Sequence, residues 1–297
     1  PERATLRPAT LSRPATMSGL PESFVPGWHD EAEVRKMKFR TLPHYGQVSV
    51  ISFGASGLGG MFTAGQGTGL ADAKAGSADE KEDVWFAEDA EADKQAAKDI
   101  VQMCLKAGVN IIDTSHWYGQ GRSERLLGHA LKGVPRQAFY LNSKIGRYDK
   151  DPMRMFDFTY EKTYQGVLDT LKRLQLDYVD SMQVHDPEFA PSTDIIVNET
   201  LPALQKLKEE GKIKYVGMTG YPLATQREII EKALAKGISI DTSLSYCHYA
   251  LNDTSLVSSG FVDFCTARGI ALINASPISM GLLMDRDPPG WHPATPE

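Results

Sequence analysis

Apolar residues recur along the chain in two alternating patterns, a helical stripe and a short continuous run. Residues 94–107, for example, place Val101, Cys104 and Leu105 on one face of a helix, and Gly108 then precedes an apolar run. Such stripes predict helices, and a following glycine supplies the left-handed residue on which helices commonly end. The pattern predicts helices over 94–107, 122–131, 164–174, 201–210, 227–236 and 253–268.

Between these helices stand short apolar runs, which predict seven strands over 48–54, 109–113, 139–144, 178–184, 213–219, 238–244 and 270–276. Alternating helices and apolar strands are typical of a parallel sheet with covered faces. Seven consecutive units favour a (β/α)8 TIM-type barrel over an open doubly wound sheet. Because the sequence stops at Glu297, we expect an α/β barrel truncated after the seventh strand, without the eighth βα unit.

Three segments depart from this repeat. Residues 1–16 have little to bury, so we expect a disordered extension upstream of a start at Met17, or else a weak mitochondrial presequence. We assign the barrel domain to residues 17–297. Within it, we expect residues 17–45 to lie at the periphery. Residues 63–93 hold nine acidic residues against two lysines, which predicts an acidic disordered insertion.

Composition then narrows the class of protein. The chain has 297 residues and a formal net charge of −6, which the acidic insertion accounts for. Without a basic stripe interleaved with aromatics we expect no nucleic-acid partner, and no run approaches the roughly 20 apolar residues of a membrane helix. Three cysteines without CxxC spacing indicate reduced thiols in a cytoplasmic protein and no metal site. We expect a monomer or weak homo-oligomer.

Two motifs point instead to a Rossmann-type reductase. The glycine-rich stretch 52–60 follows a strand, and Tyr140 and Lys144 form a Tyr-x-x-x-Lys pair. A dinucleotide fingerprint needs a helix directly after its glycines, and residues 61–76 cannot form that helix. Tyr-x-x-x-Lys works on a helix, whereas four residues along a strand span about 13 Å. Both motifs therefore fail on their context.

Polar side chains close three successive predicted strands: Asp113, Lys144 and His185, with Tyr118 in the loop after the first. Each alone has a plain structural explanation, such as a helix cap or a satisfied core histidine. The active site of a barrel, however, is built at the carboxyl ends of its strands. Four such groups at the same end of one sheet therefore predict a catalytic site.

The chemistry of these four side chains suits the reduction or formation of a carbonyl. A tyrosine of pKa about 10 is a poor acid–base at neutral pH unless a cation favours its phenolate. We expect Lys144 to be that cation and Asp113 to hold its ammonium group. His185 is expected to donate a hydrogen bond to the carbonyl oxygen as hydride reaches the carbon, while Tyr118 delivers or removes the proton.

The stretch Asp-Thr-Ser-x-Trp-Tyr-Gly-x-Gly-x-Ser-Glu at 113–124, with Lys144 and His185 beyond it, resembles the aldo-keto reductase superfamily. The resemblance covers about residues 38–297. Segments 121–136, 144–158, 183–192, 216–223, 244–253 and 279–283 are similar to its L-galactose dehydrogenase-like branch. The resemblance implies catalytic roles for Asp113, Tyr118, Lys144 and His185, and an NAD or NADP cofactor across the barrel mouth.

Further contacts follow from the resemblance alone. It implies Thr219 and Gly220 near the carboxamide of the cofactor and residues 276–283 along the pyrophosphate. The cofactor-binding residues it implies are Thr219, Gly220, Ser243, Ser276, Pro277, Ser279, Gly281, Leu282 and Leu283, and its substrate residues are Trp117, Tyr148 and Asp186. Two positions depart from the family pattern: Ser243 stands where many relatives have glutamine beneath the nicotinamide, and Ala275 where many have a stacked tyrosine.

Two hypotheses about function result. The first is an NAD(P)-dependent oxidoreductase that interconverts the hemiacetal or aldehyde carbon of a sugar, a galactose- or fucose-like aldose, with its oxidised form. The second is a catalytically weak barrel that binds a nucleotide or a partner protein. The four site residues favour the first hypothesis, whereas Ala275 and the missing eighth unit favour the second.

Overall fold

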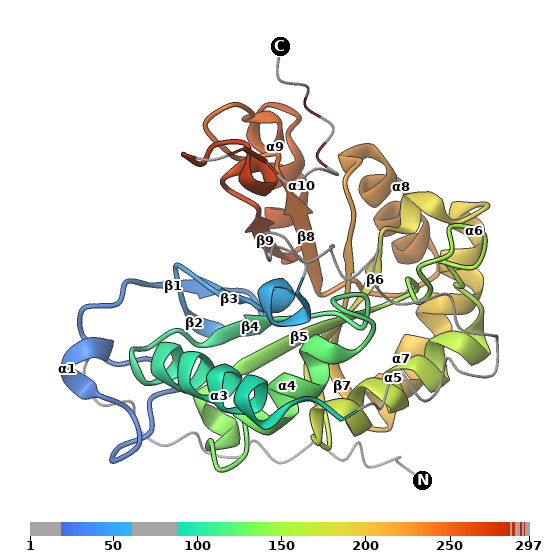
Figure 1. Cartoon of the computed structure of the whole chain (residues 1–297). Helices are drawn as coiled ribbons and strands as arrows, with labels where there is room; N and C mark the ends of the chain where they lie inside the picture. Colours follow the sequence, from blue (N-terminus) through green and yellow to red (C-terminus); the bar gives the residue numbers. More distant parts are fainter. Residues whose placement is uncertain (1–18, 61–87, 286, 289–291, 293, 295–297) are drawn as a thin grey trace, which may run out of the picture.

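Seven parallel strands form one curled sheet in the computed structural model, which describes residues 19–60, 88–285, 287–288, 292 and 294 (Figure 1). Each strand pairs with the next along the chain, from β3 to β9. The strands are β3 (Phe53–Gly54), β4 (Ile111–Asp113), β5 (Tyr140–Ile145), β6 (Val179–His185), β7 (Ile213–Thr219), β8 (Thr242–Tyr246) and β9 (Ala271–Ala275). The predicted α/β fold with a parallel sheet is confirmed.

Helices connect the strands and cover the outside of the sheet (Figure 1). They are α3 (Glu91–Lys106), α4 (Arg122–Ala130), α5 (Tyr160–Leu174), α6 (Thr193–Ile195), α7 (Leu201–Glu209), α8 (Leu223–Ala235), α9 (Ser255–Ser258) and α10 (Phe261–Thr266), and a short α1 (Glu31–Val34) precedes the sheet. The predicted helix over 253–268 is two helices, because Gly260 between them has a φ of 72°. Gly108, with a φ of 97°, follows α3 as predicted.

Side chains along each strand alternate between the helix-covered face and the interior of the curl. The outward side chains are mostly apolar: Ile112 lies opposite Leu141, and both belong to the main core. The inward ones are often polar: Asn142 lies opposite Ser181, whose hydroxyl is 2.9 Å from that of Thr242. This alternation brings polar side chains from neighbouring strands to the carboxyl end of the sheet.

An antiparallel hairpin, which the sequence pattern did not predict, packs at the amino-terminal end of the sheet. It consists of β1 (Phe39–Leu42) and β2 (Gly46–Ser49). The predicted strand over 48–54 is therefore wrong in part, because Val48 and Ser49 belong to the hairpin and the large sheet begins with β3. The single apolar run 48–54 therefore contributes to two different sheets, the hairpin and the large parallel sheet.

Tyr45, in the turn of the hairpin, is fully buried against Ile111 and Ala271. Its hydroxyl donates a hydrogen bond to Oδ1 of Asn142 at 2.9 Å. The hydroxyl of Tyr215 in turn donates to the carbonyl of His44 at 2.7 Å. The expectation that 17–45 is peripheral is therefore wrong, since the end of this segment fills the floor of the curled sheet.

Replacing Tyr45 with phenylalanine should lower the free energy of unfolding by about 1–3 kcal/mol, because the buried carbonyl of Asn142 loses its donor. Denaturant unfolding of the purified protein measures the change. The control is Tyr249→Phe, at a tyrosine that is 53% exposed, for which we expect no change. Equal stability of Tyr45→Phe and the wild type would show that this hydrogen bond does not hold the hairpin.

The predicted extension over residues 1–16 and most of the acidic insertion, up to residue 87, lie outside the described residues. Among the residues that are described, no helix combines the length and apolarity needed to cross a membrane.

The last residues of the predicted insertion, 88–93, form ion pairs with helix α4. Helix α3 begins within them. The carboxylate of Asp89 pairs with Arg125 at 2.9 Å, and that of Asp93 pairs with Arg122 at 2.7 Å, so both contact α4. The boundary at 93 was therefore placed too late, because acidic composition alone does not separate a loop from the acidic first turn of a helix.

Candidate active site

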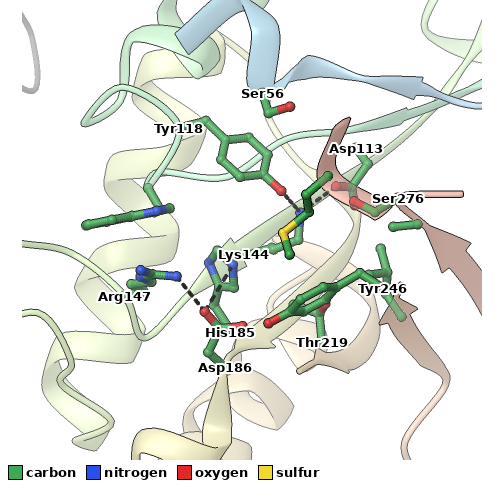
Figure 2. A pocket seen from close by; sticks show the side chains of 14 residues that line it. Ser56, Asp113, Tyr118, Lys144, Arg147, His185, Asp186, Thr219, Tyr246 and Ser276 are labelled. Atoms are coloured by element: carbon green, nitrogen blue, oxygen red, sulfur yellow. Dashed lines mark hydrogen bonds and ion pairs between the residues drawn. The ribbon is translucent and has the colours of Figure 1, made fainter. Parts of the chain in front are cut away.

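A cavity of about 300 Å³ opens at the carboxyl ends of the strands (Figure 2). It brings together side chains from six strands or the loops that follow them, together with one residue from the loop after β3. The lining residues are Ser56, Asp113, Trp117, Tyr118, Lys144, Arg147, His185, Asp186, Thr219, Leu244, Tyr246, Ala275, Ser276 and Met280. All four predicted catalytic residues therefore share one cavity.

Lys144 links two of the other predicted residues. Its ammonium group donates hydrogen bonds to Oδ1 of Asp113, to the carbonyl of Thr114 at 2.9 Å and to the hydroxyl oxygen of Tyr118 at 3.2 Å. Because an ammonium group has three donors, these contacts use all of them. The Tyr118 oxygen is an acceptor here, so its own proton is not used in this contact.

Charge and burial act on these groups in opposite directions. Burial alone would lower the pKa of Lys144, but Asp113 and Tyr118 beside it raise that pKa above its ordinary value, so the ammonium is charged at neutral pH. Burial raises the pKa of Asp113, and the ammonium opposes that rise. The geometry is that of a buried ion pair, in which each charge compensates the other.

At Tyr118 the cation acts in the expected direction, against the effect of burial. Burial raises the pKa of its hydroxyl, and Lys144 only partly offsets that rise, with Asp113 adding to it. The net direction is upward, so Tyr118 is a neutral phenol at neutral pH. The cation moderates the cost of forming the phenolate without making it the resting form.

His185 faces Tyr118 edge-on across the cavity, with ring centroids 6.3 Å apart and planes at 89°. Burial, together with Lys144 and Arg147, holds the pKa of its imidazole well below the ordinary value, so the ring is neutral. Nδ1 lies 3.2 Å from Oγ of Ser115, which itself accepts the backbone N–H of Trp117 at 3.1 Å. This arrangement favours a Ser115 hydroxyl that donates to Nδ1, which leaves the proton on Nε2.

Two glycines allow Tyr118 to reach this position. The short 3-10 helix Ala55–Gly59 packs directly on the turn that carries Tyr118. A Cβ atom on Gly59 would lie 2.5 Å from the carbonyl carbon of Tyr118, and one on Gly119 would lie 2.5 Å from the carbonyl oxygen of Gly59. Only glycine permits this approach of two backbones.

An arginine and a carboxylate form a second polar group in the cavity (Figure 2). Nη1 of Arg147 donates to Oδ2 of Asp186 at 2.7 Å, and its guanidinium stacks 4.0 Å from the ring centre of Trp117. Burial raises the pKa of Asp186 to about 6, while Arg147 lowers it and Glu188 raises it further. The pair is therefore ionised at neutral pH.

The structure separates the predicted substrate residues. Trp117 and Asp186 line the cavity, whereas Tyr148 does not. The ring of Tyr148 is buried in the main core, and its hydroxyl donates to the carbonyl of Lys162 at 3.3 Å. The prediction for Tyr148 is wrong because this residue follows the end of β5 by three positions and turns back toward α5.

Ser243 is also wrongly assigned to the cofactor. In β8 it lies opposite Met218 of the outward set, and its hydroxyl donates to Oε1 of Gln226 in α8 at 2.7 Å. Leu244, one residue later, faces the cavity. A strand has a period of two, so an error of one residue moves a side chain to the opposite face.

The other implied cofactor residues fall into two groups. Thr219 and Ser276 line the cavity, and so does Ala275. Gly220 does not: its open side faces Glu188, whose carboxylate oxygen would lie 2.5 Å from an added Cβ atom. The remaining residues, Pro277, Ser279, Gly281, Leu282 and Leu283, lie in the loop after β9, beside the cavity but outside its lining.

Sequence reasoning missed four lining residues: Ser56, Arg147, Leu244 and Tyr246. The position of Arg147, directly beyond the strand that ends at Lys144, was a usable signal, and so was the alternation along β8. The sequence holds no such signal for Ser56, because only the packing of the segment after β3 brings this residue to the cavity. The strand assignment that argued against the Tyr140–Lys144 motif is confirmed by β5.

Comparison with known proteins identifies the family. The aldo/keto reductase family model matches residues 83–295. The chain belongs to the aldo/keto reductase family. It is therefore an NAD(P)-dependent oxidoreductase.

Relatives in sequence and structure agree with this family. L-galactose dehydrogenase of Arabidopsis thaliana is 39% identical over 88% of this chain and 72% of its own length. D-arabinose 1-dehydrogenase of Saccharomyces cerevisiae is 32% identical over 67% of this chain, which spans only 60% of that protein. The holo form of an aldo-keto reductase from Bacillus halodurans has a TM-score of 0.62 at 25% identity, covering 86% of this chain and 71% of that one.

Proposed function

We propose that this aldo/keto reductase interconverts the hemiacetal or aldehyde carbon of an aldose with its oxidised form, on a galactose- or fucose-like sugar, with Tyr118 as acid–base. The observation that carries this proposal is the hydrogen-bonded series Asp113–Lys144–Tyr118, with a neutral His185 across the same cavity. A buried phenol that accepts from a charged lysine is suited to exchange one proton with a substrate oxygen.

In the direction of reduction, Tyr118 gives its own proton to the substrate oxygen. Lys144 stabilises the phenolate that remains, because its ammonium already contacts the phenol oxygen. His185 donates from Nε2 to the same substrate oxygen and stabilises charge that builds there. In the direction of oxidation, Tyr118 takes the proton from the sugar hydroxyl, and Asp113 keeps the ammonium in place throughout.

The rim of the cavity fits a nicotinamide cofactor. Bound NAD(P) supplies or accepts the hydride. Leu244 and Met280 offer an apolar wall to a flat ring, and Thr219 and Ser276 offer hydroxyls to its carboxamide. Ala275 leaves space beside the wall without adding a polar group, so the hydroxyls carry the polar recognition.

Support for a sugar substrate comes from the relatives. The two curated relatives described above are named for the oxidation of L-galactose and D-arabinose, both aldoses. The cavity offers such a substrate the charged groups of Arg147 and Asp186.

The proposal is tested by incubating the purified chain with L-galactose, L-fucose or D-arabinose and either NAD⁺ or NADP⁺. We expect reduced nicotinamide to accumulate with at least one aldose, as measured by its absorbance. Absence of turnover with every aldose, from protein shown by calorimetry to be folded and to bind the nucleotide, would favour the alternative of a catalytically weak nucleotide-binding barrel. Ala275 is the residue that favours this alternative.

A further inference from the structure

Asp113 uses only one of its two carboxylate oxygens within the protein. Oδ1 accepts from the ammonium group of Lys144 (Figure 2), whereas Oδ2 is buried without a hydrogen-bond partner among the described residues. Leaving a buried carboxylate oxygen without a donor is unfavourable, and almost all buried polar atoms in proteins have a partner. We therefore expect a donor beside Oδ2 that the side chains in direct contact do not supply.

Asn142 carries unused donors next to this oxygen. In the register of the sheet, Asn142 of β5 is the partner of Asp113 at the end of β4. Asn142 is fully buried, and its Oδ1 accepts from the hydroxyl of Tyr45 at 2.9 Å. That contact leaves the two N–H groups of Nδ2, which have no partner in the part of the chain that the structure describes. An unused donor and an unused acceptor therefore stand on adjacent strands.

The spacing of these two side chains fits one water molecule. Paired residues on neighbouring strands point to the same face about 4.8 Å apart, and asparagine and aspartate side chains have the same length, so Nδ2 and Oδ2 are roughly 5 Å apart. That separation is too long for a direct hydrogen bond. It matches two hydrogen bonds of about 2.8 Å that meet at a water oxygen. A water there accepts from Nδ2 and donates to Oδ2 at the same time.

Gln183 offers a third partner from the next strand. It is fully buried, and neither Oε1 nor Nε2 of its amide has a hydrogen-bond partner among the residues described. Its register partner is Lys144, which places it diagonally from Asn142, a separation that long side chains reach across. An internal water typically makes about three hydrogen bonds to otherwise unpaired polar groups. A donor, an acceptor and an amide that serves as either meet that requirement.

We propose that an internal water joins Nδ2 of Asn142 to Oδ2 of Asp113, and that Asn142 is thereby a positioning residue for the ammonium group of Lys144. The carboxylate is then fixed through both of its oxygens, because the water donates to one and the ammonium to the other. Through Tyr45, the hairpin below the sheet becomes connected to the acid–base. This inference rests on the proposed function, in which that ammonium stabilises the phenolate.

A crystal structure of the wild-type, nucleotide-free chain tests the water itself. At a resolution that shows ordered water, we expect density for one water within about 2.7–3.2 Å of both Nδ2 of Asn142 and Oδ2 of Asp113. A second structure with the nicotinamide nucleotide bound should keep this water in place. No density between the two side chains, or a direct contact of Oδ2 with the nucleotide, would overturn the proposal. These structures need no variant.

The Asn142→Leu variant tests the positioning role. Leucine fills a similar volume without an amide, so the water loses a partner and the carboxylate of Asp113 is held less firmly. Hydrogen bonds to a carboxylate lower its pKa, so we expect the pKa of Asp113 to rise by about one unit in the variant. NMR titration of ¹³C-labelled aspartate carboxyls in the nucleotide-free protein measures this shift, with Asp113→Asn to identify the signal.

The substitution leaves the other groups around this carboxylate unchanged. The ionisable side chains that act on it are Lys144 from β5, Tyr118 from the loop after β4 and Tyr45 from the hairpin. A merely structural effect of the substitution would not raise the pKa of Asp113 selectively. In kinetics, the acid limb of the pH–rate profile should move to higher pH, because Asp113 must be charged to hold the ammonium.

Tyr45→Phe is the matched control, since it removes the other hydrogen bond of Asn142 and leaves Nδ2 in place. We expect it to keep the wild-type pKa of Asp113. An unchanged pKa in folded Asn142→Leu, or an equal rise in both variants, would overturn the positioning role. Failure of every aldose to react would overturn the proposed function, whereas the crystal structures and the NMR titration decide the water site without turnover.

Discussion

Tyr118→Phe should lower kcat by about 10²- to 10⁴-fold, the usual effect of removing a positioned acid–base. Phenylalanine keeps the ring that packs against His185 and removes only the hydroxyl that accepts from Lys144. The hydroxyl is a neutral phenol at neutral pH because burial raises its pKa, so the wild-type residue has a proton to give. Steady-state kinetics with the preferred aldose and nucleotide measure the loss.

A measurement of cofactor affinity distinguishes the loss of the proton donor from a loss of the folded structure. The Kd of the nucleotide, measured by fluorescence titration, should change little in Tyr118→Phe. Tyr221→Phe serves as the matched control, because this tyrosine is 44% exposed and lies outside the cavity lining. If Tyr118→Phe kept more than about a tenth of the wild-type kcat, the proton would have another source and the assignment would be wrong.

Lys144→Met should be nearly inactive, with a loss of at least about 10²-fold in kcat. Its ammonium lowers the pKa of Tyr118 against the effect of burial, so removing it raises that pKa further. In the direction of reduction the rate falls as pH rises through the pKa of the acid. The basic limb of the pH–rate profile should therefore move to higher pH in the variant.

Two comparisons make this result specific. Asp113→Asn should lower kcat less than Lys144→Met, since it disturbs the position of the ammonium and leaves its charge. It should not move the basic limb to higher pH, because Asp113 itself raises the pKa of Tyr118. Lys232→Met, which removes an exposed pair with Asp194, should leave activity and pH profile unchanged. Lys144→Met also leaves Asp113 buried without its cation, so thermal unfolding must show a folded variant. An unmoved pH profile in a measurably active Lys144→Met would remove Lys144 from the mechanism.

The fold could be predicted because its periodicities are local. A stripe of apolar residues every three or four positions and a glycine that ends it are properties of one helix, and an apolar run is a property of one strand. Their repetition implied a parallel sheet without any knowledge of contacts. The hairpin was not predicted because 48–54 forms one apolar run. In the structure, Val48 pairs with β1 and Phe53 pairs with β4.

The four catalytic candidates could be predicted for a related reason. Consecutive parallel strands end at the same edge of a sheet, so polar residues at their ends converge whatever the details of packing. The resemblance, which supplied the finer contacts, failed at Ser243, where the face of a strand depends on register to within one residue. It failed at Tyr148 too, because a residue beyond a strand end is placed by its loop.

The sequence by itself determined the class of fold and pointed to Asp113, Tyr118, Lys144 and His185 at one end of the sheet as the candidate site, because each follows from order along the chain. Only the tertiary structure decided the ionisation of Tyr118 and the pairing of Arg147 with Asp186. It alone placed Tyr45 on the floor of the sheet. Burial and side-chain contacts depend on distances between segments remote in sequence, and neither composition nor periodicity encodes those distances.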